Sequence, residues 1–240
     1  MHNVRSIGTI VTCLLAALLG AGCSVVVGGA GRPVAGIAPR PVTGVTIEQA
    51  LLGTAELEKL LDQSVRALQP PATGARPSCF APWCRPNDCL GVLAEMQSSS
   101  YRSADVRDVV WESWLDGRSA FAGVVAVDEG VVALPTAAEA DALFATFAEQ
   151  WSRCDGKAAT YRDQTYRITD VRVADSVLAA TLQTSPSPIA RAIGVRVNCL
   201  VEVKVPFSAD VRSTPDRPGR PGNPAIAIAR RMMDKISDLS

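Results

Sequence analysis

Residues 136–154 read TAAEADALFATFAEQWSRC and carry the clearest helical pattern in the chain. Thr136 and Glu139 form a capping box, in which each side chain can bond a backbone amide at the start of a helix. Apolar side chains then recur every three or four residues, at Ala140, Leu143, Phe144, Phe147, Trp151 and Cys154. This spacing predicts an amphipathic helix that packs one face on a core.

Residues 195–205 read VRVNCLVEVKV, with an apolar residue at every second position. This alternation predicts one continuous strand with a buried face and a mostly solvated face. Cys199 falls on the buried face, while Cys154 falls on the apolar stripe of the predicted helix. Both thiols should therefore point into the same layer, which predicts a Cys154–Cys199 disulfide that joins helix to sheet.

Weaker patterns elsewhere predict helices and strands around these two segments. The pair Asn223-Pro224 can start a C-terminal helix in which Ile228, Met232 and Ile236 share a face. Further helices are expected at 54–66 and 89–96, strands at 101–114, 121–133, 165–173 and 177–183, and a loop at 68–88. Helices at both ends of a run of strands favour an α+β fold, with a mostly antiparallel sheet packed against helices and stapled by disulfides.

The N-terminus has the features of a bacterial lipoprotein signal. Arg5 precedes an apolar run, Ile10–Leu19, and the small residues Gly20-Ala21-Gly22 then lead into Cys23. The run is too short to span a bilayer, and small residues mark a cleavage site. We therefore predict a signal peptide at 1–22, lipid such as palmitate on Cys23, and a lipid-anchored protein on the extracytoplasmic face of the cell membrane. An ordinary secretory signal with an unmodified Cys23 is the alternative.

The remainder of the chain is long enough for one domain. Residues 23–44 are rich in Gly and Pro, a composition typical of a flexible tether, and residues 45–240 form the predicted domain. The 24 basic and 24 acidic residues balance, which gives no support for binding nucleic acid.

Catalysis is disfavoured because His2, the single histidine, lies in the predicted signal peptide. Without imidazole, the mature chain has no Ser-His-Asp mechanism and no histidine ligand for zinc. The nearest carboxylate pairs are Asp128/Glu129, predicted to form a turn with the following glycine, and Glu139/Asp141, of which Glu139 serves the helix cap. We predict no enzyme, no cofactor and no metal site.

Three cysteines, Cys79, Cys84 and Cys89, lie close together in the sequence. In an exported protein they favour a disulfide over a metal cluster. Which two of the three form this second bridge is left open. The mature chain then has an odd thiol, which is free or pairs with another molecule.

Several short motifs together resemble the PknH-like extracellular (sensor) domain family of mycobacterial kinases and lipoproteins. They are Leu51-Leu52-Gly53-Thr54-Ala55-Glu56-Leu57, Cys89 followed by Tyr101, Leu134-Pro135-Thr136, Trp151-Ser152-Arg153-Cys154, and Ala192-Ile193-Gly194-Val195-Arg196-Val197-Asn198-Cys199. The resemblance implies an antiparallel sheet with helices and a cleft for an unidentified ligand. It also implies two disulfides, one of them matching Cys154–Cys199.

These features predict a sensor-like domain that binds a small ligand at the cell envelope. The alternative is a protein–protein interaction module of the envelope without a small ligand, and an enzyme acting on cell-wall glycans is the third possibility. The ligand-binding residues stay unknown at this stage. Trp111, Trp114, Tyr161 and Tyr166 could line a cleft, although aromatic residues in strands more often pack in the core.

Overall fold

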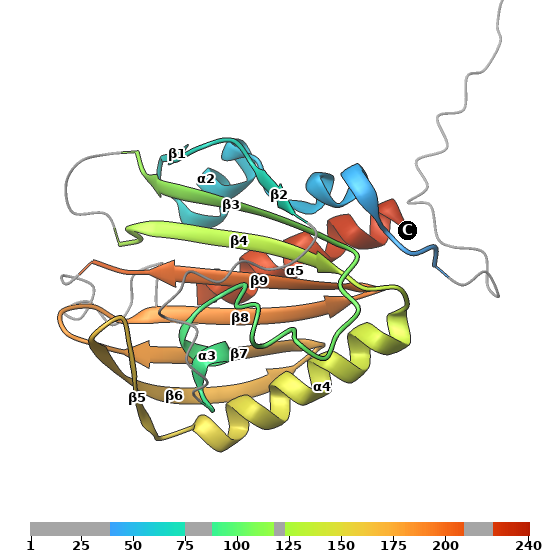
Figure 1. Ribbon diagram of the computed structural model, residues 1–240. Helices are drawn as coiled ribbons and strands as arrows, with labels where there is room; N and C mark the ends of the chain where they lie inside the picture. The colour runs from blue at the N-terminus through green and yellow to red at the C-terminus, as the bar shows by residue number, and fades with distance from the viewer. Residues whose placement is uncertain (1–38, 75–87, 118–122, 209–222) are drawn as a thin grey trace, which may run out of the picture. The chain divides into compact units, whose positions relative to one another are not determined.

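The computed structural model describes residues 39–74, 88–117, 123–208 and 223–240. This part of the chain forms a nine-stranded sheet with helices packed on both faces (Figure 1). The helices are η1 (Gly44–Ala50, a 3-10 helix), α2 (Thr54–Leu61), α3 (Leu90–Leu93), α4 (Ala137–Cys154) and α5 (Asn223–Leu239). The strands are β1 (Val65–Ala67), β2 (Ala72–Gly74), β3 (Asp108–Asp116), β4 (Ala126–Ala133), β5 (Ala158–Tyr161), β6 (Gln164–Ala174), β7 (Val177–Gln183), β8 (Ile189–Arg196) and β9 (Cys199–Pro206).

The strands follow the order β1-β3-β4-β9-β8-β7-β6-β5, and β2 also pairs with β3. All these pairings are antiparallel. Antiparallel neighbours need only short connections, so most strands pair with the strand next to them in the sequence. The predicted α+β fold with an antiparallel sheet is confirmed.

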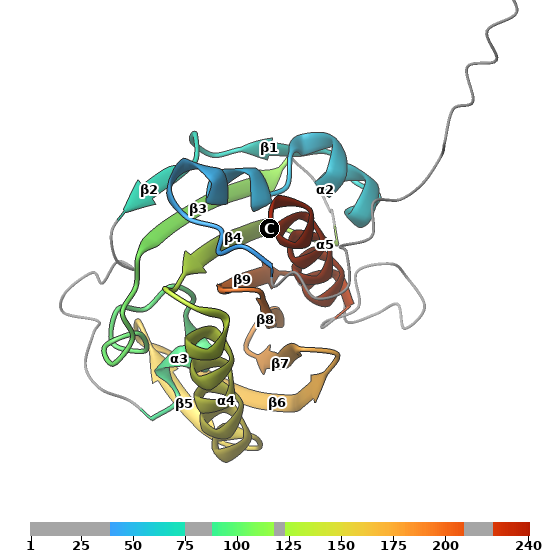
Figure 2. The ribbon, with the colours of Figure 1, turned by 90° about the vertical axis from the view of Figure 1, so that its right-hand side faces the viewer.

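Alternating side chains divide the interior into two cores, one on each face of the sheet. Val131 and Val201 point into the core beneath η1, α2 and α5, which we call the α5 face. Val132 and Leu200 point into the core beneath α3 and α4, which we call the α4 face. Figure 2 shows α4 and α5 on opposite sides of the sheet.

Helix α4 begins after the predicted Thr136 cap and has the predicted buried face. The Thr136 hydroxyl accepts a hydrogen bond from the backbone N–H of Glu139 at 3.2 Å. The buried residues of the helix are Ala140, Leu143, Phe147, Trp151 and Cys154. Five of the six predicted stripe positions are therefore buried, and Phe144 packs at the edge of the same core.

The predicted single strand at 195–205 is wrong, because these residues form the hairpin between β8 and β9. Arg196 pairs with Cys199 across a two-residue turn, and Val197 adopts a positive φ of 53° there. Asn198 holds the turn, since its side chain accepts from Val42 N–H at 2.7 Å and donates to the carbonyl of Leu134 at 2.7 Å. The apolar alternation continues through the turn and therefore hides it.

Helix α5 follows the C-terminal prediction and covers the centre of the sheet. Ile228, Met232 and Ile236 are fully buried against the strands. The helix comes so close to β8 that a Cβ at Gly194 would overlap the sulfur of Met233. Glycine at this position therefore suits the close packing of α5 on β8 rather than a special backbone conformation.

The folded unit begins earlier than the predicted tether boundary at residue 44. Val42 is buried, and its amide and carbonyl both bond the side chain of Asn198. The compact unit extends from Pro39 to Ser240. Cys23, the predicted signal peptide and the first part of the tether lie outside the described residues.

The remaining predictions vary in accuracy. Strands predicted at 101–114, 121–133, 165–173 and 177–183 correspond to β3, β4, β6 and β7, while the helices predicted at 54–66 and 89–96 correspond to the shorter α2 and α3. The short strands β1, β2 and β5 were not predicted. None of the described helices has the length and apolar character needed to cross a membrane.

Candidate functional site

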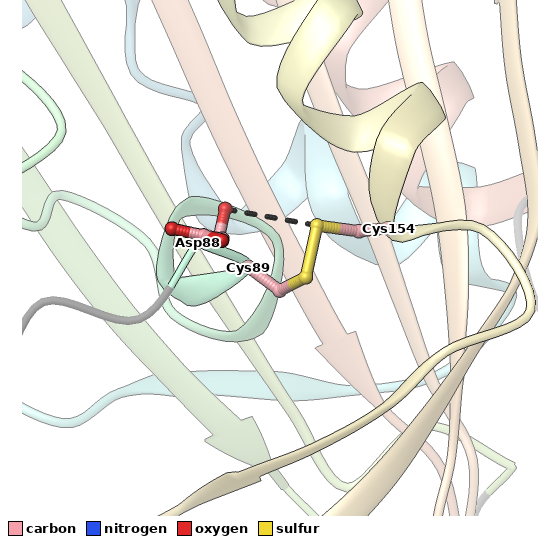
Figure 3. The surroundings of a disulfide bond; sticks show 3 residues. All are labelled: Asp88, Cys89 and Cys154. Atoms are coloured by element: carbon pink, nitrogen blue, oxygen red, sulfur yellow. Dashed lines mark hydrogen bonds between the residues drawn. A yellow bond between two sulfur atoms is a disulfide. The ribbon is translucent and has the colours of Figure 1, made fainter.

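A disulfide joins Cys89, just before α3, to Cys154, the last residue of α4 (Figure 3). The two Cα atoms lie 5.8 Å apart, a normal separation for a bridge. The Cys154 sulfur also lies 3.6 Å from the carbonyl oxygen of Asp88. This is a close contact rather than a hydrogen bond, because a disulfide sulfur carries no proton.

The predicted Cys154–Cys199 disulfide is wrong. Cys199 is a free, buried cysteine in the core of the α5 face, whereas Cys154 lies in the core of the α4 face. The sheet separates the two thiols, since the hairpin turn places Cys199 on the opposite face from the one that α4 covers. Burial, together with the charge of Asp108, raises the pKa of the Cys199 thiol to about 12, so it stays protonated and unreactive.

The Cys89–Cys154 bridge also corrects the predictions for the cysteine trio. Cys89 is paired outside the trio, so the second predicted bridge does not include it and a three-thiolate metal cluster does not form. Cys79 and Cys84 lie outside the described residues.

We expect removal of this bridge by Cys89→Ala with Cys154→Ala to lower the free energy of unfolding by roughly 3–4 kcal/mol. The reason is that the bridge spans a sequence separation of 65 residues, and closing a loop of this size restricts the unfolded chain. Urea unfolding of the oxidised protein and the double variant measures the loss. Cys199→Ala is the matched control and should cost only about 1 kcal/mol. A loss with Cys199→Ala as large as with the double variant would contradict the assignment.

Beneath α3, the α4 face contains a buried ion pair between Arg191 of β8 and Glu202 of β9. The Arg191 Nη2 and Glu202 Oε2 atoms lie 2.9 Å apart, and both side chains are almost completely buried. Glu202 also accepts hydrogen bonds from the Tyr101 hydroxyl at 2.5 Å and from the Met96 amide at 3.1 Å. Arg191 in turn donates to the Val92 carbonyl at 3.1 Å. The pair therefore anchors α3, through Val92, and the irregular segment that follows it, through Met96 and Tyr101, to the sheet.

A second group of charges lies beside this pair, closer to solvent. The Lys204 ammonium lies 3.3 Å from Glu95 and 3.1 Å from Asp128, which also accepts from the Ser113 hydroxyl. Burial opposes ionisation of Glu95, but Lys204 and Arg191 outweigh burial and keep its pKa below the usual value. Burial likewise opposes the charge of Lys204, but Glu95 and Asp128 raise its pKa. Lys204 thus stays protonated, and a protonated amine is not a nucleophile.

The α5 face contains a buried carboxyl group, that of Glu129. It accepts hydrogen bonds from the Leu52 amide at 3.2 Å and from Trp114 Nε1 at 3.1 Å. Its cross-strand neighbour on β3 is another acid, Glu112. Burial raises the pKa of Glu129 to about 8, and the charge of Glu112 adds to this, although the two donors act against it. The carboxyl is thus largely neutral at neutral pH and ties the start of α2 to the sheet.

The most promising ligand site is a groove between the first turns of α5 and the β6–β7 hairpin. Its volume is about 330 Å³. The lining residues are Arg172, Ala174, Val177, Ala179, Ile226, Ala227 and Arg230. Small and apolar residues form the floor, and the only charged lining residues are the two arginines. We call this feature the α5–β6 groove.

Two other hollows of the described structure are less suited to a charged ligand. One, of about 300 Å³ beside α4, is lined by the acids Asp105 and Glu139. The other, of about 310 Å³ beside η1 and β2, mixes Arg107 with Glu48 and Asp108. In both, acidic side chains oppose an anion, so the α5–β6 groove alone of the three has positive charge and no acidic lining residue.

The residues singled out from the sequence do not meet at the groove. Trp114 and Tyr166 are buried, while Trp111 and Tyr161 pack at the edge of the α4-face core. These four residues therefore pack in the core or at its edge, and none of them lines the groove.

The predicted carboxylate pairs do not form a catalytic dyad. Asp128 and Glu129 lie within β4 rather than in a turn, so their side chains point to opposite faces. Glu139 lies at the exposed start of α4, where its backbone N–H donates to the Thr136 hydroxyl, and its neighbour Asp141 is also exposed.

The described residues define an α+β domain whose antiparallel sheet is covered by helices on both faces. A family model described as the PknH-like extracellular domain matches residues 42–235, so the chain belongs to the PknH-like extracellular domain family. The match begins at Val42, the first buried residue of the unit. The prediction of the family from the sequence is confirmed.

Among solved structures, the chain is similar to the crystal structure of the extracellular domain of PknH from Mycobacterium tuberculosis. The two share 23% sequence identity with a TM-score of 0.66, and the match covers 84% of this chain and 100% of the other. This likeness shows a common fold. A search of curated proteins finds no match.

Proposed function

We propose that this protein is a lipoprotein held on the extracytoplasmic face of the cell membrane by lipid on Cys23, and that its sensor-like domain binds a small ligand. The observation that carries ligand binding is the α5–β6 groove. Its volume of about 330 Å³ is within the range of small-molecule sites, about 300–1,000 Å³. An apolar floor with a few polar groups at the rim is also typical of such sites.

The anchoring part of the proposal is supported by the sequence before the folded unit. The apolar run and Gly20-Ala21-Gly22-Cys23 have the order of a lipoprotein signal. The residues between Cys23 and Pro39 would give the domain reach from the bilayer. The membership in a family of extracellular domains is consistent with export.

We expect Cys23→Ala to abolish lipid attachment and to release the protein from the membrane fraction. The full chain is expressed in a bacterial host that processes lipoproteins, with an alkyne-tagged palmitate as label. Cys13→Ala is the matched control, because Cys13 lies in the apolar run and should not be acylated. Label that persists on the Cys23→Ala protein would contradict the anchor.

Native mass spectrometry of residues 24–240, produced in an oxidising compartment, tests ligand binding. These residues include the whole compact unit from Pro39 to Ser240. We expect a reproducible excess mass that is lost on denaturation. A bare native mass would contradict a bound ligand.

The alternative is an envelope protein–protein interaction module without a small ligand. An unpaired thiol that could form an intermolecular bridge would favour such a module. Cys199 does not support this argument, because it is buried beneath α5. A discrete cross-linked partner together with a bare native mass would favour this alternative.

A further inference from the structure

The α5–β6 groove depends on an irregularity in β6 that changes which side chain faces α5. Thr169 pairs with Thr181, but the next pair is Arg172 with Ala179, so β6 holds one extra residue at this point. In an unbroken register, Val171 would pair with Ala179 and would share its face. The bulge thus places a charged side chain where the uninterrupted strand would place an apolar one, a common use of bulges near binding sites.

Small side chains keep the floor of the groove open. Ala174 and Ala179 lie on the two strands, and Ala227 lies on the helix side. Val177 and Ile226 complete an apolar floor on which a hydrocarbon chain could lie. At about 330 Å³ the groove has room for about ten water-sized groups, since one water occupies about 30 Å³.

The two arginines are placed on opposite walls of the groove. Arg172 comes from β6 and makes no ion pair with any of the residues that the structure describes. Arg230 comes from α5 and lies 2.7 Å from Asp175 in the β6–β7 turn. Both members of this pair are at least half exposed, so the interaction is weak and can be exchanged for another anion.

We propose that the groove binds an elongated apolar molecule that ends in a carboxylate or phosphate, with Arg172 and Arg230 holding the anionic end. This inference rests on the proposed ligand-binding function and names the chemistry of its ligand. Arginine suits this role because its planar guanidinium can bind both oxygens of a carboxylate or phosphate. Asp175 occupies Arg230 when the ligand is absent and competes with it.

Calorimetric titration of residues 24–240 with monomeric decyl phosphate tests the inference, with decanol and decyltrimethylammonium as neutral and cationic comparisons. We expect decyl phosphate to bind more tightly than either. Arg172→Gln and Arg230→Gln should each weaken it by about tenfold, because each removes a charge-assisted bond. Arg66→Gln, an exposed arginine on β1, is the matched control and should have no effect.

Asp175→Asn is expected to strengthen the binding of decyl phosphate, whereas the arginine variants weaken it. It removes the competing carboxylate, so the affinity for decyl phosphate should rise several-fold. Asn tolerates the positive φ of 52° at this position, so the turn should persist. Weaker binding by this variant would contradict competition between Asp175 and the ligand.

Other outcomes separate this inference from the proposed function. Equal binding of decanol and decyl phosphate, no binding of either, or binding only to phosphatidylglycerol vesicles would overturn the ligand chemistry. An excess native mass of a cationic or fully polar compound would also overturn it while supporting a ligand-binding domain. A bare native mass would instead overturn the proposed function.

Discussion

Glu202→Gln is expected to lower the free energy of unfolding by roughly 3 kcal/mol, because removing one partner leaves a buried charge uncompensated. Arg191 is completely buried, and Glu202 is its nearest carboxylate at 2.9 Å. The amide keeps an oxygen for the Tyr101 and Met96 donors, so the variant isolates the loss of negative charge. Glu95, whose Oε2 atom lies 3.9 Å from Arg191, offsets only part of it.

Equilibrium urea unfolding of wild type and variant measures this effect. Glu149→Gln is the matched control, since it removes an exposed ion pair with Arg153 on α4 and should cost less than about 1 kcal/mol. Combining Glu202→Gln with Arg191→Met should cost less than the sum of the single changes, because the double variant has no buried charge left unpaired. Additive losses would show that the two side chains do not interact.

Glu129→Gln is expected to make stability less dependent on pH. The unfolded chain releases the proton of this carboxyl near its ordinary pKa of 4.5, whereas burial raises the pKa in the folded protein to about 8. Between these values the folded protein holds more protons than the unfolded chain, so stability falls as pH rises. The stabilisation is fully present below about pH 4.5 and is lost through about pH 8. The full change is on the order of 5 kcal/mol, at about 1.4 kcal/mol for each pKa unit.

The test is the difference in unfolding free energy between Glu129→Gln and wild type at about pH 5 and about pH 9. The variant should gain relative to wild type as pH rises, because glutamine keeps an acceptor for Leu52 and Trp114 without titrating. Glu112 contributes in the same direction, since burial, together with the charge of Glu48, raises its pKa. Glu149→Gln should show no such trend. A constant difference between Glu129→Gln and wild type would contradict the buried carboxyl.

A helix or a strand could be predicted from the sequence where apolar residues recur at one regular spacing and a capping or turn residue marks its end. Helix α4 has its Thr136 cap, and β7 occupies the predicted residues 177–183. The β8–β9 turn could not be found in this way, because valine is rare at a positive φ and the apolar alternation continues through Val197. Asn198 is of a type common in turns, but a single asparagine does not interrupt the pattern. Only the three-dimensional contacts of Asn198 with Val42 and Leu134 explain why the chain reverses there.

The error in the disulfide follows from that missed turn. The alternation of side chains along a strand shows that one face is buried, but it does not show whether α4 or α5 covers that face. Only the topology of the sheet places Cys199 beneath α5. The α5–β6 groove could not be predicted from the sequence either. Arg172 faces α5 only because of the bulge in β6, and its partner wall comes from a helix that begins about fifty residues later.

Ligand binding in the α5–β6 groove is tested most directly by comparing the native masses of wild type and Ala174→Phe, each produced as residues 24–240 and purified without detergent. Ala174 is an exposed lining residue of the groove, so a phenyl ring there should fill the groove without disturbing the core. Ala158→Phe, at an exposed position on β5, is the matched control. We expect an excess mass on wild type and Ala158→Phe that is missing from Ala174→Phe. An excess mass that persists on Ala174→Phe, or its absence from all three proteins, would contradict ligand binding in the α5–β6 groove.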